Sequence, residues 1–316
     1  MGVMIDGEWH VEGKFPTSAS GAFVRPQTSF RNWITPDGSA GPTGEGGFVA
    51  EAGRYHLYVS YACPWAHRTL IFRKLKGLTE FISLSVVNWH MGERGWTFAP
   101  GPGVTDDPIN HAAYLSEIYA AADPKYTGRV TVPVLWDKQR KAIVSNESAD
   151  IIRMFNSAFD AAGAAPGDYY PEALRSEIDA LNARVYDTVN NGVYRCGFAR
   201  SQGAYEEAFA ELFATLDVLE ARLSSSRFLF GEATTEADWR LFVTLLRFDA
   251  VYVGLFKCNL RRIADYPHLQ RYLIDLVRWP GVAETVNMAH IKRHYYESLT
   301  AINPTGVVPV GPLLGF

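Results

Sequence analysis

One cysteine in this sequence stands where a thiol could act as a nucleophile. Cys63 follows an alternating apolar segment and precedes Pro64, and proline is favoured at the first position of a helix because its missing N–H would be unpaired there. The free N–H groups and the dipole of a helix N-terminus favour negative charge, so a thiol placed there can have its pKa lowered from about 8.5 into the range of about 3.5–7.5. We therefore expect Cys63 to be a reactive thiolate rather than a buried structural cysteine, which is the usual fate of a free thiol.

The motif around Cys63 holds a single thiol. Position 66 is alanine, so the motif is Cys-Pro-Trp-Ala, whereas a dithiol oxidoreductase needs a second cysteine to resolve the mixed disulfide. The second thiol must then come from a small molecule such as glutathione. Cys196 and Cys258 have no partner at a motif spacing, and we expect both to be packing residues. His290 and His294 could share a helical face, but no further close ligand joins them, so we expect no metal site.

Two further elements could hold a thiol ligand built like a peptide. Val132 precedes Pro133 at the start of a predicted strand. A cis bond there would turn the Val132 N–H and C=O toward a ligand, whereas the sequence alone favours an ordinary trans proline on an edge strand. Glu147 and Ser148 open a predicted helix, an anion site that suits a γ-glutamyl carboxylate, with Glu147 accepting from the ligand amine. Alone this pair is only a helix cap; the three elements in order are far more specific.

Hydrophobic patterns predict the elements that position these residues. The first part of the chain has the order β-α-β, then a polar insertion, then β-β-α. Strands are predicted over Tyr55–Val59 and Phe81–Val87, a helix over Trp65–Leu75 that stops at Gly77, a polar, Gly- and Pro-rich insertion including Trp89–Pro108, a hairpin over Val130–Ser145 with its turn at Asp137–Lys141, and a helix that opens at Ser148.

The second part of the chain is predicted to be entirely helical. Beyond Pro171 no strand pattern recurs, and helices are predicted over Glu172–Asn191, Tyr205–Leu223, Asp238–Tyr252 and Pro267–Trp279. Thr235-Glu236-Ala237-Asp238 has the spacing of an N-terminal helix cap. A linker around Ala161–Asp168 separates the two parts. We therefore predict an α/β domain over residues 51–162 and an all-helical domain over residues 168–316.

The first fifty residues form a segment of a different kind. They are rich in Gly, Pro, Ser and Thr and show no sustained period, which predicts a long coil extension over residues 1–50. Aromatic residues are spaced through it, namely Trp9, Phe15, Phe23, Phe30 and Trp33. Their density indicates a coil anchored to the surface of the protein rather than a free tail.

Composition excludes several classes of protein. The chain has 316 residues, 47% of them hydrophobic, which is typical of a globular protein and too apolar for a disordered one. A net charge of −4 offers nothing that would attract nucleic acid or an anionic membrane. Three cysteines indicate a reducing compartment. No secretion signal or membrane-spanning apolar run is recognisable, so we expect a cytoplasmic protein.

Taken together, the motifs resemble those of the glutathione transferase superfamily, and most closely its xi class, the glutathionyl-hydroquinone reductases. The segments that carry the resemblance are YACPWAHR (Tyr61–Arg68), RVTVPVLWD (Arg129–Asp137), NES (Asn146–Ser148), NGVYRCGFA (Asn191–Ala199), Thr235–Asp238, RFDAVYVGLFKCN (Arg247–Asn259) and HYYESLTAINPTGVVPVGP (His294–Pro312). The resemblance covers nearly the whole chain. It implies a thioredoxin-like N-terminal domain, an all-helical C-terminal domain, glutathione as co-substrate and a homodimer.

The resemblance also implies a role for individual residues. Cys63 would be the nucleophile, and Tyr194 the proton donor in an aromatic pocket. The glutathione site would be lined by Trp96, Arg129, Val130, Thr131, Val132, Glu147 and Ser148. Tyr252 and Tyr295 would point their hydroxyls at the sulfur, where O–H donors favour a thiolate over a thiol. Tyr295 and Tyr296 diverge on a helix, and the family pattern selects Tyr295.

The implied reaction removes glutathione from a glutathionyl-hydroquinone and leaves a Cys63–glutathione mixed disulfide, which a second glutathione resolves. The nearest alternative is an omega-type thiol transferase or dehydroascorbate reductase, which also uses a monothiol Cys-Pro motif. A conjugating transferase is less consistent with the sequence, because such enzymes normally activate glutathione with a Ser or Tyr hydroxyl. A further alternative is a non-catalytic protein that binds hydrophobic ligands.

Overall fold

A computed structural model of the chain describes residues 2–11 and 16–315. Phe15, one of the aromatic residues expected to anchor the N-terminal coil, lies outside the described residues. The described residues form two compact units. The first, here called the sheet unit, comprises those of Met1–Lys14, Gln27–Gly167 and Glu284–Ser298, and the second, the helical unit, comprises those of Phe15–Pro26, Asp168–Ala283 and Leu299–Phe316. The units therefore interleave along the chain, whereas the boundaries expected from the sequence run in order.

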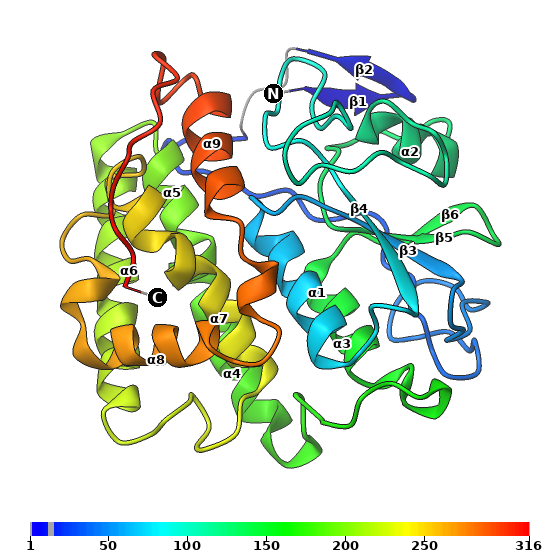
Figure 1. Ribbon diagram of the computed structural model, residues 1–316. Coiled ribbons are helices and arrows are strands. Elements are labelled where there is room, and N and C mark those ends of the chain that lie inside the picture. The colour runs from blue at the N-terminus through cyan, green and yellow to red at the C-terminus, as the bar shows by residue number, and fades with distance from the viewer. Residues whose placement is uncertain (1, 12–15, 316) are drawn as a thin grey trace. The chain divides into compact units, whose positions relative to one another are not determined.

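The sheet unit is built on a four-stranded sheet with the strand order β4-β3-β5-β6 (Figure 1). The strands are β3 (Tyr55–Val59), β4 (Ile82–Val86), β5 (Val134–Asp137) and β6 (Ala142–Ser145). β3 is parallel to β4 and antiparallel to β5, which pairs with β6 as the predicted hairpin. All five residues of β3 are buried, because a central strand is covered on both faces of the sheet.

The sheet unit also contains the helices α1 (Pro64–Leu75), α2 (Leu115–Ala122), α3 (Ser148–Ser157) and α9 (Met288–Ser298). α1 packs against α3, and α2 lies against β6 (Figure 1). The predicted mixed α/β fold is confirmed. α1 begins at Pro64 and α3 begins at Ser148. α2 was not predicted, since it is only eight residues long and lies within a polar insertion.

The N-terminal segment is more ordered than the predicted coil. It begins with a hairpin of β1 (Val3–Ile5) and β2 (Glu8–His10), which pair antiparallel. Asp6 and Gly7 both have positive φ, as a tight hairpin turn requires, and an Asp-Gly pair is the sequence signal for such a turn. Three-residue strands are too short to show a period. The anchoring role of the aromatics is confirmed for Phe23, which packs on Phe198 within the helical unit.

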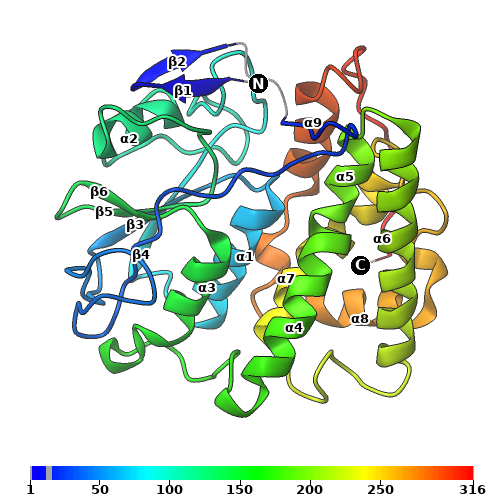
Figure 2. The same ribbon diagram turned by 180° about the vertical axis from the view of Figure 1, so that it is seen from behind.

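The helical unit contains α4 (Arg175–Val185), α5 (Gly192–Phe198), α6 (Gln202–Leu223), α7 (Glu236–Arg247) and α8 (Pro267–Val277), which pack against one another (Figure 2). The expected helix from Glu172 to Asn191 is divided into a short 3₁₀ turn, α4 and a π-helix, Tyr186–Asn190. A second π-helix, Phe248–Tyr252, continues α7. The wider turns of π-helices leave no signal in a 3.6-residue period, and they often occur at functional sites.

The predicted helix cap at the start of α7 is confirmed. The Asp238 carboxylate accepts hydrogen bonds from the backbone N–H of Thr235 (2.7 Å) and from its hydroxyl (3.1 Å). It also accepts from the backbone N–H of Leu229 and from the Tyr272 hydroxyl, at 2.9 and 3.0 Å. Asp238 is fully buried, and this burial raises the pKa of its carboxyl group. The cap therefore also ties α7 to the preceding loop and to α8.

None of the helices among the described residues combines the length and the apolar character that crossing a membrane requires.

Candidate active site

Cys63 occupies the N-cap position of α1, as its sequence context predicts. Its backbone is extended (φ −75°, ψ 122°), and its carbonyl oxygen accepts the hydrogen bond from the His67 N–H that opens the helix. The first turn of α1 holds no acidic residue and its last turn holds Arg73 and Lys74, so nearby charge does not oppose the helix dipole. The thiol is partly exposed, whereas Cys196 and Cys258 are buried. Cys63 is thus the accessible thiol of the three.

The Cys63 thiol contacts the segment that precedes β5. Its Sγ atom donates to the carbonyl oxygen of Val132 at 3.5 Å, and the Val132–Pro133 peptide bond is cis. Tyr119, on α2, fixes this segment: its hydroxyl donates to the Thr131 carbonyl oxygen at 2.8 Å and accepts from the Thr131 N–H at 3.2 Å. Burial raises the pKa of Tyr119 to about 12, so the hydroxyl is protonated at neutral pH. The structure therefore brings Cys63 and Val132 together on a rigid frame.

The other residues of this segment are held in the same way. Arg129 is partly exposed, and its carbonyl oxygen accepts from the Tyr126 hydroxyl at 2.9 Å. Val130 is buried beside it. Asn146 donates through Nδ2 to the Tyr119 hydroxyl at 3.1 Å, which links the segment to the start of α3. The sequence does not predict the role of Tyr119, because it does not predict α2, the helix that carries this residue.

Glu147 and Ser148 form the start of α3. Glu147 is the N-cap, and its Oε1 atom accepts from the N–H of Ala149 at 3.0 Å. Ser148 is buried, and its hydroxyl oxygen accepts from Nη1 of Arg68 at 3.4 Å. The Arg68 guanidinium is itself buried and lies 4.6 Å from the ring centre of Trp65. A buried cation and a helix N-terminus at one serine favour a bound carboxylate.

Trp96 lies in the insertion that follows β4. Residues of α9 hold this insertion in place. The buried Trp96 indole stacks on the His294 imidazole, with ring centroids 4.8 Å apart and planes inclined by 21°. His294 also donates through Nδ1 to the Trp89 carbonyl oxygen at 2.7 Å, and His290 donates through Nε2 to that of Pro102 at 2.6 Å. The two histidines do share one helical face, where they organise a loop.

Tyr295 and Tyr296 differ in exposure on α9. Tyr295 is buried, and its ring lies edge-on to that of His294, with centroids 5.3 Å apart. Tyr296 is only partly buried. Because α9 belongs to the sheet unit, Tyr295 lies in the same compact unit as Cys63, although 231 residues lie between them in the chain.

Tyr194 and Tyr252 lie in the helical unit, within an aromatic cluster. Their ring centroids are 6.1 Å apart, and Phe256 packs against both, 5.5 Å from Tyr194 and 5.3 Å from Tyr252. Arg25, from the N-terminal segment, places its guanidinium 4.7 Å from the centre of the Tyr194 ring and donates through Nε to Asn191 Oδ1 at 2.8 Å. The sequence does not predict this cation, since no local pattern relates Arg25 to Tyr194.

Cys196 and Cys258, expected to be packing residues, are neighbours in the helical unit. Both are buried, and burial, together with the nearby Cys196 thiol, raises the pKa of Cys258 well above its usual range. The sequence does not predict that they are close, because 61 residues lie between them in the chain.

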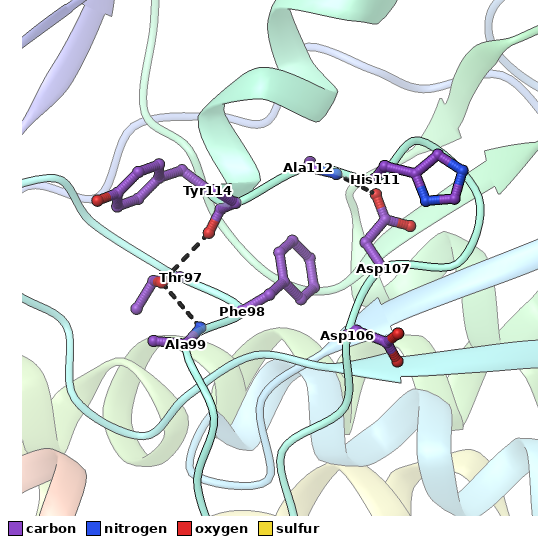
Figure 3. Close-up of a pocket in the computed structure, with 9 residues that line it drawn as sticks. Thr97, Phe98, Ala99, Asp106, Asp107, His111, Ala112 and Tyr114 are labelled. Atoms are coloured by element: carbon purple, nitrogen blue, oxygen red, sulfur yellow. Dashed lines mark hydrogen bonds between the residues drawn. The ribbon is translucent and has the colours of Figure 1, made fainter.

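A polar cavity of about 460 Å³ is lined by two stretches of the insertion, residues 97–99 and 106–107, and by residues 111–114 (Figure 3). Its lining contains none of the predicted site residues. The Asp107 carboxylate organises its wall by accepting from the Tyr58 hydroxyl at 2.8 Å and from three backbone N–H groups. Within residues 2–11 and 16–315, no three His, Cys, Asp or Glu side chains are grouped to hold a metal ion.

Comparison with protein families identifies both parts of the chain. Residues 62–158 match the glutathione S-transferase N-terminal domain, and residues 202–274 match the C-terminal domain. The first match begins one residue before Cys63 and includes β5, β6 and α3.

Individual relatives match over almost the full length. The chain is 59% identical to the glutathionyl-hydroquinone reductase YqjG of Escherichia coli, with 99% of this chain and 95% of the relative covered. It is 57% identical to the glutathionyl-hydroquinone reductase PcpF of Sphingobium chlorophenolicum, with 99% and 96% covered.

Solved structures agree with this assignment. The glutathione-bound structure of YqjG from Escherichia coli superimposes with a TM-score of 0.92 over 99% of this chain and 96% of that chain, at 57% identity. The xi glutathione transferase of Phanerochaete chrysosporium gives a TM-score of 0.89 over 94% and 95%, at 52% identity. The thioredoxin-like and all-helical fold is therefore confirmed, and the chain belongs to the glutathione transferase family, within its xi class.

Proposed function

We propose that this protein is a glutathione-dependent enzyme that reduces glutathionyl-hydroquinones to free hydroquinones. The observation that carries the proposal is the near full-length identity, 59% and 57%, to two glutathionyl-hydroquinone reductases. Such a reaction needs an accessible nucleophilic thiol and no second cysteine. Cys63 is a partly exposed thiol at the N-terminus of α1, in a motif without a second cysteine. Glutathione acts as the co-substrate.

In the first step, the Cys63 thiolate attacks the glutathione sulfur of the thioether. A bond forms between the two sulfur atoms while the bond between sulfur and the ring carbon breaks. The electron pair of the broken bond stays on the ring carbon, which takes a proton from Tyr194. The products are a free hydroquinone and a Cys63–glutathione mixed disulfide.

In the second step, another glutathione thiolate attacks the glutathione sulfur of the mixed disulfide. Oxidised glutathione leaves, the Cys63 thiolate is restored, and the proton released when the second glutathione ionises returns to Tyr194. Overall, one glutathione thiol and the glutathionyl group are oxidised to a disulfide while the ring carbon is reduced from C–S to C–H.

Each predicted site residue has a role in this scheme. Trp96, Arg129 and the backbone of Val130, Thr131 and Val132 bind the glutathione moiety, Ser148 binds the γ-glutamyl carboxylate, and Glu147 binds the amine. Tyr252 and Tyr295 donate their hydroxyls to the reacting sulfur. The contact between Cys63 and Val132 and the buried Arg68 beside Ser148 support this arrangement.

The test is a product analysis. Purified protein is incubated with a glutathionyl-hydroquinone and excess glutathione, and the products are separated by chromatography. We expect one free hydroquinone and one oxidised glutathione per turnover, with a ping-pong rate law. Cys63→Ala should lose turnover and keep its melting temperature, whereas the matched control Cys196→Ala should keep turnover. Appreciable turnover by folded Cys63→Ala would refute the scheme.

An omega-type thiol transferase activity is the second candidate. It is favoured by 49% identity to the glutathione S-transferase omega-like 2 of Schizosaccharomyces pombe, over 94% of this chain. The same assay decides between the two: reduction of dehydroascorbate or of a simple mixed disulfide, without release of hydroquinone, would assign the protein to this activity. We further propose that the enzyme is a cytoplasmic homodimer, consistent with its family and with three cysteines that are not joined in disulfides.

A further inference from the structure

A short segment near the N-terminus lies along the edge of the sheet where α3 begins. The N–H of Asn32 donates to the carbonyl oxygen of Val144 at 2.9 Å, and the N–H of Asn146 donates to that of Phe30 at 3.2 Å. The Asn146 side chain returns a bond by accepting from the N–H of Phe30 at 3.3 Å. This segment, residues 28–32, therefore extends the sheet beside β6. Its first residue, Thr28, lies next to Glu147.

Within this segment, Thr28 contacts the Glu147 carboxylate. The Thr28 hydroxyl donates to Oε2 at 3.2 Å, while the N–H of Ala149 donates to Oε1 at 3.0 Å. Each oxygen of the Glu147 carboxylate thus accepts one hydrogen bond from the protein. A carboxylate offers about four acceptor positions, so two remain for the N–H groups of a ligand ammonium.

The position of Thr28 is itself well fixed. The Phe30 ring packs on those of Tyr126 and Tyr119, with centroids 5.5 and 5.8 Å away. Arg31 forms a two-pronged ion pair with Asp150 in the first turn of α3, and Nη2–Oδ1 measures 3.0 Å. Both anchors lie within three residues of Thr28, so the hydroxyl is held against Glu147 at little further cost in conformational entropy.

We propose that Thr28 is a positioning residue for the amine-binding carboxylate, and that its hydroxyl holds Glu147 in the rotamer that receives the γ-glutamyl ammonium group of glutathione. This inference rests on the proposed glutathione site and extends it to the N-terminal segment that pairs with the edge of the sheet. Without the hydroxyl, the carboxylate keeps the cap bond to Ala149 but loses its hydrogen bond at Oε2, and the side chain gains freedom to rotate.

The first test compares Thr28→Val with Thr28→Ser. Valine keeps the volume of threonine and removes the donor, while serine keeps the donor. We expect Thr28→Val to raise the KM for glutathione about 3- to 10-fold with kcat little changed, the size of effect typical of one ordinary hydrogen bond. Thr28→Ser should retain the wild-type KM. Equal KM values for all three proteins would overturn the inference.

A second test isolates the amine. Glutaryl-cysteinylglycine is glutathione with the α-amine of its γ-glutamyl residue replaced by hydrogen. If Thr28 acts through Glu147 on the amine, wild type and Thr28→Val should bind this analogue equally, although they bind glutathione unequally. A Thr28→Val defect of the same size for both ligands would show a general structural role and overturn the inference. Melting temperatures measured beside each titration report loss of folding.

Glu147→Gln separates this inference from the proposed site. If Glu147→Gln leaves the KM for glutathione unchanged, the carboxylate does not bind the amine, and the premise itself fails. If Glu147→Gln raises the KM and Thr28→Val does not, only the role of Thr28 fails. We expect the double variant Thr28→Val/Glu147→Gln to have the same KM for glutathione as Glu147→Gln alone, because Thr28 then has no carboxylate to position.

Discussion

The imidazole of His294 stacks on the indole of Trp96 and holds the insertion by donating to the Trp89 carbonyl oxygen. Two residues 198 positions apart thus share one contact. Because α9 also carries Tyr295, one helix connects the predicted glutathione-binding tryptophan with a tyrosine predicted to face the sulfur.

Replacing His294 should therefore weaken glutathione binding. His294→Ala loses both the stacking and the hydrogen bond, and we expect the KM for glutathione to rise about 10-fold. His294→Phe keeps an aromatic ring against Trp96 and should show a smaller rise. Steady-state kinetics with varied glutathione measures both, with His268→Ala, a substitution on α8 in the other unit, as the control. A wild-type KM for folded His294→Ala would contradict this role.

The three cysteines should react very differently with an alkylating agent. In the folded protein, iodoacetamide should modify Cys63 alone, because the other two thiols are buried and the pKa of Cys258 is raised by burial and by Cys196. Intact mass spectrometry should show one added group in buffer and three in denaturant. Rapid labelling of two or three cysteines in the native protein would contradict the buried pair.

His56 should make the protein less stable in acid. It lies buried on β3 between the hydroxyls of Ser83 and Ser85, at 2.7 and 3.0 Å, and burial lowers its pKa from 6.5 to about 4. The unfolded chain therefore binds more protons between these values. The stability contributed by neutral His56 is complete above pH 6.5 and is lost as the pH falls toward 4, by about 3 kcal/mol in total.

Denaturant unfolding from pH 7 to pH 4 measures this loss. His56→Asn keeps polar atoms near the two serines and does not titrate in this range, so its free energy of unfolding should fall less steeply than that of the wild type. Identical slopes for the two proteins would show that His56 is not the titrating group.

Asp238 should be among the residues most important for stability. Asp238→Ala removes the acceptor for Thr235, Leu229 and Tyr272 in a fully buried site, and we expect a loss of about 3–5 kcal/mol in the free energy of unfolding. Glu232→Ala, in the exposed loop just before the same helix, is the matched control and should change stability by less than about 0.5 kcal/mol. Calorimetric melting compares them, and similar curves would refute the prediction.

Sequence alone determined the features that depend on neighbouring residues. Cys63 before Pro64 starts a helix because of local backbone chemistry, and Thr235 with Asp238 caps one because three residues bring the carboxylate back to the free N–H groups. The strands β3–β6 and helices α1 and α3 follow from apolar periods in the same way.

Only the tertiary structure decided the contacts between distant segments. Thr28 meets Glu147, and His294 meets Trp96, across 119 and 198 positions of chain. Such contacts depend on the pairing of residues 28–32 with the sheet edge and on the packing of the insertion against α9. No local period or motif encodes either of them. For the same reason α9, which follows the helical part of the chain, belongs to the unit that contains Cys63.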